Sequence, residues 1–179
     1  MGRTGGRTGR RRPRPSVAPV VTAANAPTVF RAPMRSRDDD VPVHEAVERA
    51  LELGLCGLGG RLTSAPESLD DAVSLAREQH GDRLARRIGR FAAAEDGAVV
   101  WTRDADGLYW RGELDGPWRY DASSEAERVD LVHVRPCRWA TEPFDESGIP
   151  EGVRVAFARG GRNWQGIRSE SRVSPARSS

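Results

Sequence analysis

The sequence lacks lysine altogether, and all 28 of its basic side chains are arginine. This absence excludes chemistry that needs a lysine ammonium in this chain: a phosphate-loop lysine, a Schiff base, or the lysine of restriction-type nuclease cores. Cysteine is scarce, with only Cys56 and Cys137. Two cysteines without a secretory signal indicate a reducing compartment, and we therefore expect a cytoplasmic protein.

Long apolar runs are also missing from the sequence. No stretch of about 18 apolar residues occurs that could cross a bilayer. The basic residues 10–15 are followed by Pro19 and Pro27, which make a poor signal-peptide core. We therefore expect no membrane partner.

Clusters of metal-binding or catalytic side chains are not evident in the sequence. The three histidines are far apart, and neither cysteine lies at a metal-ligand spacing from a histidine. His133 and Cys137 would lie about 13 Å apart on one extended strand, too far for a nucleophile and its base. We therefore predict no metal, no cofactor and no enzymatic activity.

Charge is divided unevenly along the chain. Residues 1–37 contain nine Arg and no acid, whereas residues 38–167 contain 16 Arg and 25 Asp plus Glu, a net charge of −9. A uniformly basic nucleic-acid-binding surface is therefore not expected, and any nucleic-acid site must rely on a local arginine cluster or a pocket.

Composition divides the chain into two tails and one domain. Residues 1–40 and 169–179 are predicted to be disordered tails, the first of them basic. The first tail is a basic arm for nucleic acid, a solvated tail, or upstream sequence preceding a true start at Met34. Residues 41–95 are predicted to be helical, and residues 96–168 are predicted to form a β module.

Three helices are predicted in residues 41–95. The first carries Val43, Val47, Ala50 and Leu51 and ends at Gly54, and residues 55–60 follow as a flexible connection. The second begins after Ser68 in a capping-box pattern. The third, after Gly81, has an apolar stripe on one side. Its other side is either a solvated face or a phosphate-facing one, and carries Arg83, Arg86, Arg87 and Arg90.

Short strands are predicted in the second half of the chain. They cover residues 98–102, 108–114, 118–120, 129–135 with a continuation at 137–139 after Pro136, and 164–167. A short helix or turn is predicted at residues 153–158. Helices followed by several short strands predict an α+β fold with a small, bent β-sheet or barrel.

Three stretches of these strands resemble a known module. Residues 97–101 (Gly-Ala-Val-Val-Trp), 109–120 (Tyr-Trp-Arg-Gly-Glu-Leu-Asp-Gly-Pro-Trp-Arg-Tyr) and 133–139 (His-Val-Arg-Pro-Cys-Arg-Trp) resemble the N-terminal region of Mrr-type restriction endonucleases, which belongs to the PUA-like group with EVE and YTH domains. The likeness covers residues 80–167. Ala98 stands where the family usually has Asp. The family's nuclease domain is missing, so the resemblance implies a nucleic-acid-binding module that lacks the domain that cleaves the DNA.

The resemblance implies a PUA-like fold that holds a flipped or modified base in an aromatic pocket. The alternative is that these rings form the core of a small barrel. The ligand-binding residues that the resemblance implies are Trp101, Trp118, Tyr120, His133, Arg135 and Trp139.

A second candidate site lies near the end of the predicted domain. Arg159, Arg162, Asn163 and Trp164 surround a Gly-Gly pair, a combination suited to binding phosphate oxygens. The alternative is a turn after a helix, with Gly160 as its left-handed cap.

Two functions are compatible with these patterns. One is a non-catalytic module that binds DNA or RNA, is linked to restriction or phage defence, and depends on a protein partner for catalysis. The other is a protein–protein interaction or accessory protein, whose acidic surface and exposed Trp would contact a partner.

Overall fold

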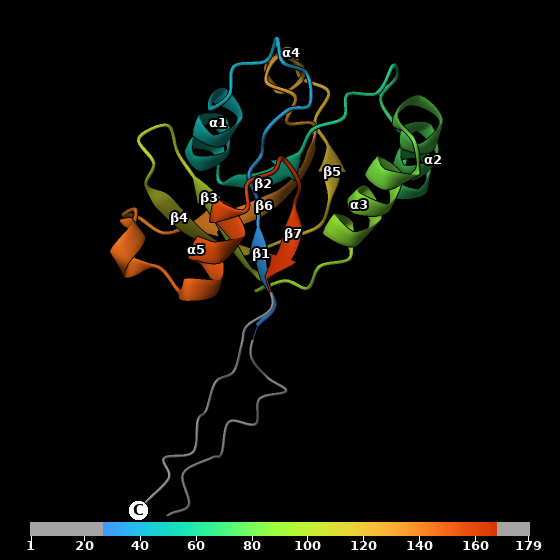
Figure 1. Cartoon of the computed structure of the whole chain (residues 1–179). Helices are drawn as coiled ribbons and strands as arrows, with labels where there is room; N and C mark the ends of the chain where they lie inside the picture. The colour runs from blue at the N-terminus through green and yellow to red at the C-terminus, as the bar shows by residue number, and fades with distance from the viewer. Residues whose placement is uncertain (1–26, 168–179) are drawn as a thin grey trace, which may run out of the picture.

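The computed structural model of the protein describes residues 27–167 (Figure 1). The two predicted tails therefore lie outside the described residues at positions 1–26 and 169–179. The strands are β1 (Val29–Arg31), β2 (Leu55–Leu58), β3 (Val99–Arg103), β4 (Tyr109–Leu114), β5 (Arg119–Tyr120), β6 (His133–Trp139) and β7 (Gln165–Ile167). The helices are α1 (Glu45–Leu53), α2 (Leu69–His80), α3 (Asp82–Ala92), α4 (Ser124–Arg128) and α5 (Glu151–Ala158), with a 3₁₀ turn at Glu146–Gly148.

The strands form one mixed sheet that curls into a half-barrel. Along the sheet the order is β2-β6-β4-β3-β1-β7, and β5 pairs with β6 beside this path. β1 runs parallel to β3, and the other pairs are antiparallel. The predicted α+β class with a bent sheet is confirmed, but two strands, β1 and β2, precede the helices α2 and α3.

Both faces of the sheet are covered at β3. Val100 belongs to a large apolar cluster that includes residues of α1, α2 and α3, whereas Val99 and Trp101 belong to a second cluster with Val153 of α5. Successive side chains of a strand point to opposite faces, so β3 divides its residues between the two clusters. In Figure 1, α2 and α3 lie together and α5 lies away from them.

Three helices, α1, α2 and α3, lie within the segment predicted to be helical. The Ser68 hydroxyl accepts a 3.1 Å hydrogen bond from the Asp71 N–H at the start of α2. α1 ends at Gly54, whose φ of 64° is left-handed. In α3 the predicted apolar stripe is buried and comprises Leu84, Ile88 and Phe91.

Residues 29–34 correct the prediction of a disordered tail up to residue 40. They form β1 between β3 and β7, followed by Ala32, which is fully buried, and Met34, which is 4% exposed. The buried Arg31 guanidinium donates 2.5 Å hydrogen bonds to the carbonyls of Ala156 and Gly160. These bonds satisfy carbonyls at the end of α5, so β1 also fixes that helix.

Residues 55–58 correct the prediction of a flexible connection and with it the separation of a helical segment from a β module. They form β2, which is buried throughout and pairs with β6. A Cβ at Gly57 would lie 2.7 Å from the His133 carbonyl oxygen, so the close approach of the two strands needs glycine here. One strand from the predicted helical segment therefore belongs to the sheet.

The strand predicted at residues 129–135 begins later than expected. Residues 124–128 form α4, Asp130 takes a left-handed φ of 50°, and β6 starts at His133. Pro136 lies inside β6 and pairs with Leu55 of β2. On the other side of β6, β5 pairs with residues 133–134 and β4 pairs with residues 137–139. Pro136 lies between these two partners, where its missing N–H costs no ladder hydrogen bond.

Candidate functional site

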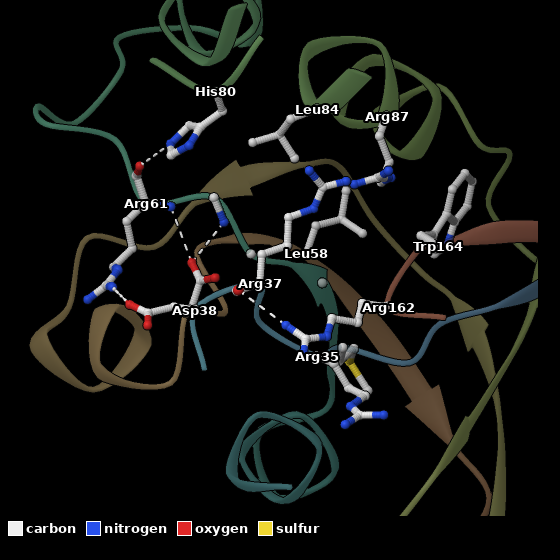
Figure 2. A pocket seen from close by; sticks show the side chains of 15 residues that line it. Arg35, Arg37, Asp38, Leu58, Arg61, His80, Leu84, Arg87, Arg162 and Trp164 are labelled. Carbon is white, nitrogen blue, oxygen red and sulfur yellow. Dashed lines mark hydrogen bonds and ion pairs between the residues drawn. The ribbon is translucent and has the colours of Figure 1, made fainter. Parts of the chain in front are cut away.

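A cavity of about 460 Å³ lies between α3, β2 and the segment that follows β1 (Figure 2). Its walls come from segments far apart in the sequence and combine arginines with apolar and small residues. Five arginines line it: Arg35, Arg37, Arg61, Arg87 and Arg162. The other lining residues are Met34, Asp38, Gly57, Leu58, Gly59, Gly60, His80, Leu84, Asp130 and Trp164.

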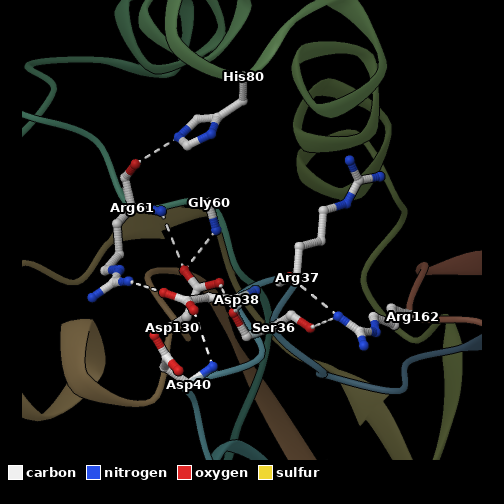
Figure 3. A network of polar contacts seen from close by, with 9 residues as sticks. All are labelled: Ser36, Arg37, Asp38, Asp40, Gly60, Arg61, His80, Asp130 and Arg162. Carbon is white, nitrogen blue, oxygen red and sulfur yellow. Dashed lines mark hydrogen bonds and ion pairs between the residues drawn. The ribbon is translucent and has the colours of Figure 1, made fainter.

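Asp130 ties together two of the segments that form the cavity (Figure 3). Its Oδ2 accepts a 2.6 Å hydrogen bond from the Ser36 hydroxyl, and its Oδ1 accepts bonds of 2.8 and 3.2 Å from the N–H groups of Gly60 and Arg61. A Cβ at Gly59 would lie 2.3 Å from Oδ2, so only glycine allows this approach. The carboxylate is therefore fully engaged by donors of the protein itself.

The second acid of the cavity is also engaged. Asp38 pairs with Arg61 at 2.9 Å, and the Arg61 carbonyl lies 2.7 Å from His80 Nε2. Arg162 donates to the carbonyls of Ser36 and Arg37 (Figure 3). It also pairs with Asp39 at 2.8 Å. Arg61 and Arg162 thus hold the loop at residues 36–39 in place.

Arg87 differs from the other arginines of the cavity. It is only 9% exposed, yet it forms no hydrogen bond or ion pair with any residue in 27–167. Figure 2 shows the Arg37 side chain extending toward it. Burial lowers the pKa of the Arg87 guanidinium, and the positive charges of Arg37 and Arg90 lower it further. Like charges converge here without a carboxylate between them.

Trp164 forms an apolar wall beside these cations. Its ring stacks on Phe30 with centroids 4.1 Å apart and meets Phe91 edge to face at 5.5 Å. It is 6% exposed, and its Nε1 has no hydrogen-bond partner within the described chain. Of the second candidate site predicted from the sequence, Arg162 and Trp164 line the cavity.

The remaining members of that predicted site do not line it. Arg159 is exposed at the end of α5, and Asn163 is exposed with its Oδ1 3.5 Å from Arg37 Nη2. Gly160 has a left-handed φ of 68°, as in the predicted turn after a helix. The segment is therefore a helix-ending turn from which two side chains reach the cavity.

The predicted aromatic cage is not assembled. Trp101 packs against Phe144 in the α5 cluster, whereas Trp118, Tyr120 and Trp139 pack on the large core, and none of the four rings lines the cavity. The prediction that they wall one base-binding pocket is corrected because β3 places Trp101 on the opposite face from its neighbour Val100.

Three of the predicted ligand-binding residues instead support a wall of the cavity from behind. His133 Nε2 lies 3.1 Å from the Gly60 carbonyl, and the Tyr120 hydroxyl accepts a 3.0 Å bond from the Leu62 N–H. Trp118 stacks near His133 with ring centroids 6.0 Å apart. These contacts position residues 60–62, so the aromatic motif organises the site without touching its interior.

His133 is neutral in this setting. Complete burial lowers its pKa to about 4, against the opposing effect of the Gly60 hydrogen bond. Because a carbonyl oxygen only accepts, Nε2 must carry the proton, which leaves Nδ1 without one. Nδ1 has no partner among residues 27–167.

Arg135 and Trp139 have structural partners. The Arg135 guanidinium donates to the carbonyls of Phe91, Ala94 and Gly116 and pairs with Asp96 at 2.7 Å. It thereby closes the C-terminal end of α3. Trp139 Nε1 donates a 2.8 Å bond to the Leu55 carbonyl. Arg135 therefore makes a helix-ending contact, and its ligand role stays a prediction of the resemblance.

A second hollow lies on the outer side of α3. It is lined by Arg83, Arg86, Arg87, Gly89 and Arg90. Arg87 lines both this hollow and the cavity described above. The α3 arginines, for which the sequence is compatible with a solvated or a phosphate-facing role, therefore lie next to the cavity.

No protein-family model and no curated protein matches the chain. Within residues 27–167, no three His, Cys, Asp or Glu side chains gather in an arrangement that could hold a metal ion. Among the helices of the same part of the chain, none has the length and apolar character needed to span a membrane.

Proposed function

We propose that the protein is a non-catalytic nucleic-acid-binding module that contacts phosphates with the arginines of the cavity and of α3. The observation that carries the proposal is Arg87, which is buried, lacks a partner within residues 27–167, and lines both hollows. A guanidinium in this position favours the binding of an anion, because its paired N–H donors match the spacing of phosphate oxygens.

The local charge supports the proposal despite the acidic balance of the domain. Neither carboxylate of the cavity contacts Arg37 or Arg87 within residues 27–167, because Asp130 is bonded to Ser36, Gly60 and Arg61 and Asp38 is paired with Arg61. Three further arginines on the outer side of α3 extend the positive surface beyond the cavity. Phosphate contacts of this kind supply most of the sequence-independent affinity for nucleic acids.

The state of the cysteines supports a binding rather than a catalytic role. Cys56 is fully buried, and burial raises the pKa of its thiol to about 12. Burial also raises the pKa of Cys137. Both thiols stay protonated at neutral pH, so neither supplies a thiolate nucleophile. A PUA-like identity, modified-base reading and a link to restriction or phage defence remain predictions of the sequence resemblance.

The test measures the binding of end-labelled single- and double-stranded DNA and RNA by fluorescence anisotropy over a range of salt concentrations. Arg86→Gln with Arg90→Gln should weaken binding and reduce the slope of log K against log salt by about 0.9 per lost duplex phosphate contact. The matched control, Arg119→Gln with Arg138→Gln, removes the same charge from exposed positions that line neither hollow.

Equal losses in the two double variants would show that only net charge matters and would contradict a site on α3. A wild-type protein that binds none of the nucleic acids would overturn the proposal and favour a protein–protein interaction module instead.

A further inference from the structure

We infer that the cavity is a seat for a phosphomonoester, carried either by the end of a nucleic-acid strand or by a free nucleotide, with Arg87 and Arg37 as its principal ligands. The inference deepens the proposed function, because it states which phosphate enters the cavity while the outer arginines of α3 contact the rest of the strand.

The burial of Arg87 is the first step. Nine-tenths of its surface is removed from solvent, although it has no anionic partner within residues 27–167. Its nitrogens are open to the two hollows rather than sealed from solvent, but the partial burial of the charge has a desolvation cost and lowers its pKa. An anion bound in the cavity would offset it and would be held by a strong, charge-assisted hydrogen bond.

The charge around the cavity is the second step. Asp130 is occupied by Ser36, Gly60 and Arg61, and Asp38 is paired with Arg61. Arg162 is occupied by Asp39 and by two carbonyls. Arg37 and Arg87 are left facing the same space, and within residues 27–167 their only polar contact is the 3.5 Å one of Arg37 to the Asn163 amide oxygen. Arg35, which is exposed, also lacks a carboxylate partner within residues 27–167, so the cavity has at least two uncompensated positive charges, which match a dianion better than a monoanion.

The geometry of phosphate groups is the third step. A phosphodiester inside a strand has two unesterified oxygens and one negative charge, and the strand must leave on both sides. A phosphomonoester has three such oxygens and a charge of about −1.5 to −2 at neutral pH. Two guanidinium forks approaching from different segments, the loop at residues 36–39 and α3, can each engage a pair of those three oxygens.

The floor of the cavity is consistent with a terminal group. Gly57 and Leu58 of the buried strand β2 form part of the lining, and Asp130 with its three hydrogen bonds closes the adjacent side. A strand cannot continue through these elements. A group that ends inside the cavity therefore fits better than one that passes through it.

The experiment compares oligonucleotides of one sequence that carry a phosphate or a hydroxyl at the 5′ end, and likewise at the 3′ end, with the fluorescent label at the opposite end. We expect one phosphorylated end to bind at least tenfold more tightly than its hydroxyl counterpart. Arg87→Gln should reduce that ratio to about one by weakening the binding of the phosphorylated oligonucleotide. Arg37→Gln, a change of an exposed side chain, should reduce the ratio without affecting folding.

Competition by a nucleoside 5′-monophosphate and by its nucleoside distinguishes the two sources of the phosphate. Displacement of the oligonucleotide by the monophosphate but not the nucleoside supports the seat. If oligonucleotides bind but their end groups make no difference, the inference fails and the proposed function stands. If the monophosphate binds in an Arg87-dependent manner and no oligonucleotide binds, the proposed function fails and the seat serves a free nucleotide.

Discussion

The Ser36 hydroxyl donates a 2.6 Å hydrogen bond to Asp130 Oδ2 across 94 residues of sequence, and both side chains are buried. This bond connects the segment after β1 to the turn before β6. Since Oδ1 of the same carboxylate holds the Gly60 and Arg61 amides, a single side chain fixes two walls of the cavity.

We expect Asp130→Ala to lower the free energy of unfolding by about 2–4 kcal/mol, because a serine hydroxyl and two amide donors lose their acceptor. Asp130→Asn should cost about half as much, because Asn tolerates the left-handed φ of 50° and keeps one acceptor oxygen. Urea denaturation of both variants measures the difference. Equal costs for Ala and Asn would contradict a role of the hydrogen bonds.

His133 makes the stability depend on pH. Its pKa is about 4 in the folded state and 6.5 when unperturbed, so the unfolded chain binds the proton more readily between these values. The stabilisation is complete above about pH 6.5 and is lost as the pH falls toward 4; the loss from pH 7.5 to 5 should be about 2 kcal/mol. His133→Gln should remove that part of the pH dependence in urea titrations at both pH values. A variant with the same pH dependence as the wild type would refute the assignment.

Two substitutions of Trp164 separate the contribution of its ring packing to stability from that of its Nε1–H. Trp164→Ala should cost about 3–5 kcal/mol, because it leaves a void beside Phe30 and Phe91. Trp164→Phe should cost much less, because the stack on Phe30 is kept and the lost Nε1–H has no partner within residues 27–167. Thermal and urea unfolding distinguish the two. A similar loss for both variants would indicate that Nε1 has an acceptor.

Gly89 lies on the outer side of α3 among its arginines, and an added Cβ would meet no atom within 4 Å. Gly89→Ala should therefore raise the free energy of unfolding by about 0.5–1 kcal/mol through helix propensity. Hydrogen exchange of the α3 amides would show whether the gain is local. A loss of stability would mean that the position is not open as described.

The role of β1 is tested by truncation. A chain starting at Met34 lacks the strand between β3 and β7 and the Arg31 contacts to α5, and we expect it to be unfolded or strongly destabilised. A chain starting at residue 27 keeps these elements and should unfold at the same urea concentration as the full chain. Circular dichroism and urea titration compare the two. A folded, cooperative chain starting at Met34 would contradict the contribution of β1.

Periodic segments were predictable from the sequence, and short nonlocal strands were not. The spacing of Leu84, Ile88 and Phe91 predicted α3, and the Ser68 pattern predicted the start of α2. β1 has three residues and β2 has four, too few for a periodic signal. Their partners, Val99 and Pro136, lie far away in sequence, so no local pattern indicates the pairing.

The candidate site was predicted only in fragments. The resemblance indicated aromatic residues, but strand alternation sends Trp101 to a different face from Val100, and a helix covers that second face. Arg87 was noted among the α3 arginines without being distinguished from them. At about 100° per residue it lies only about 40° from Phe91 around the helix, a position at the border of the apolar stripe that indicates partial burial.

Val29 and Ile167 face each other across the β1–β7 ladder. Paired strands are about 4.8 Å apart, so a short peptide could join the two described ends into a closed ring without stretching. New ends could then be opened at the exposed Ala105 and Asp106, between β3 and β4. We expect such a circular permutant to keep every strand neighbour while presenting its termini beside a hairpin turn.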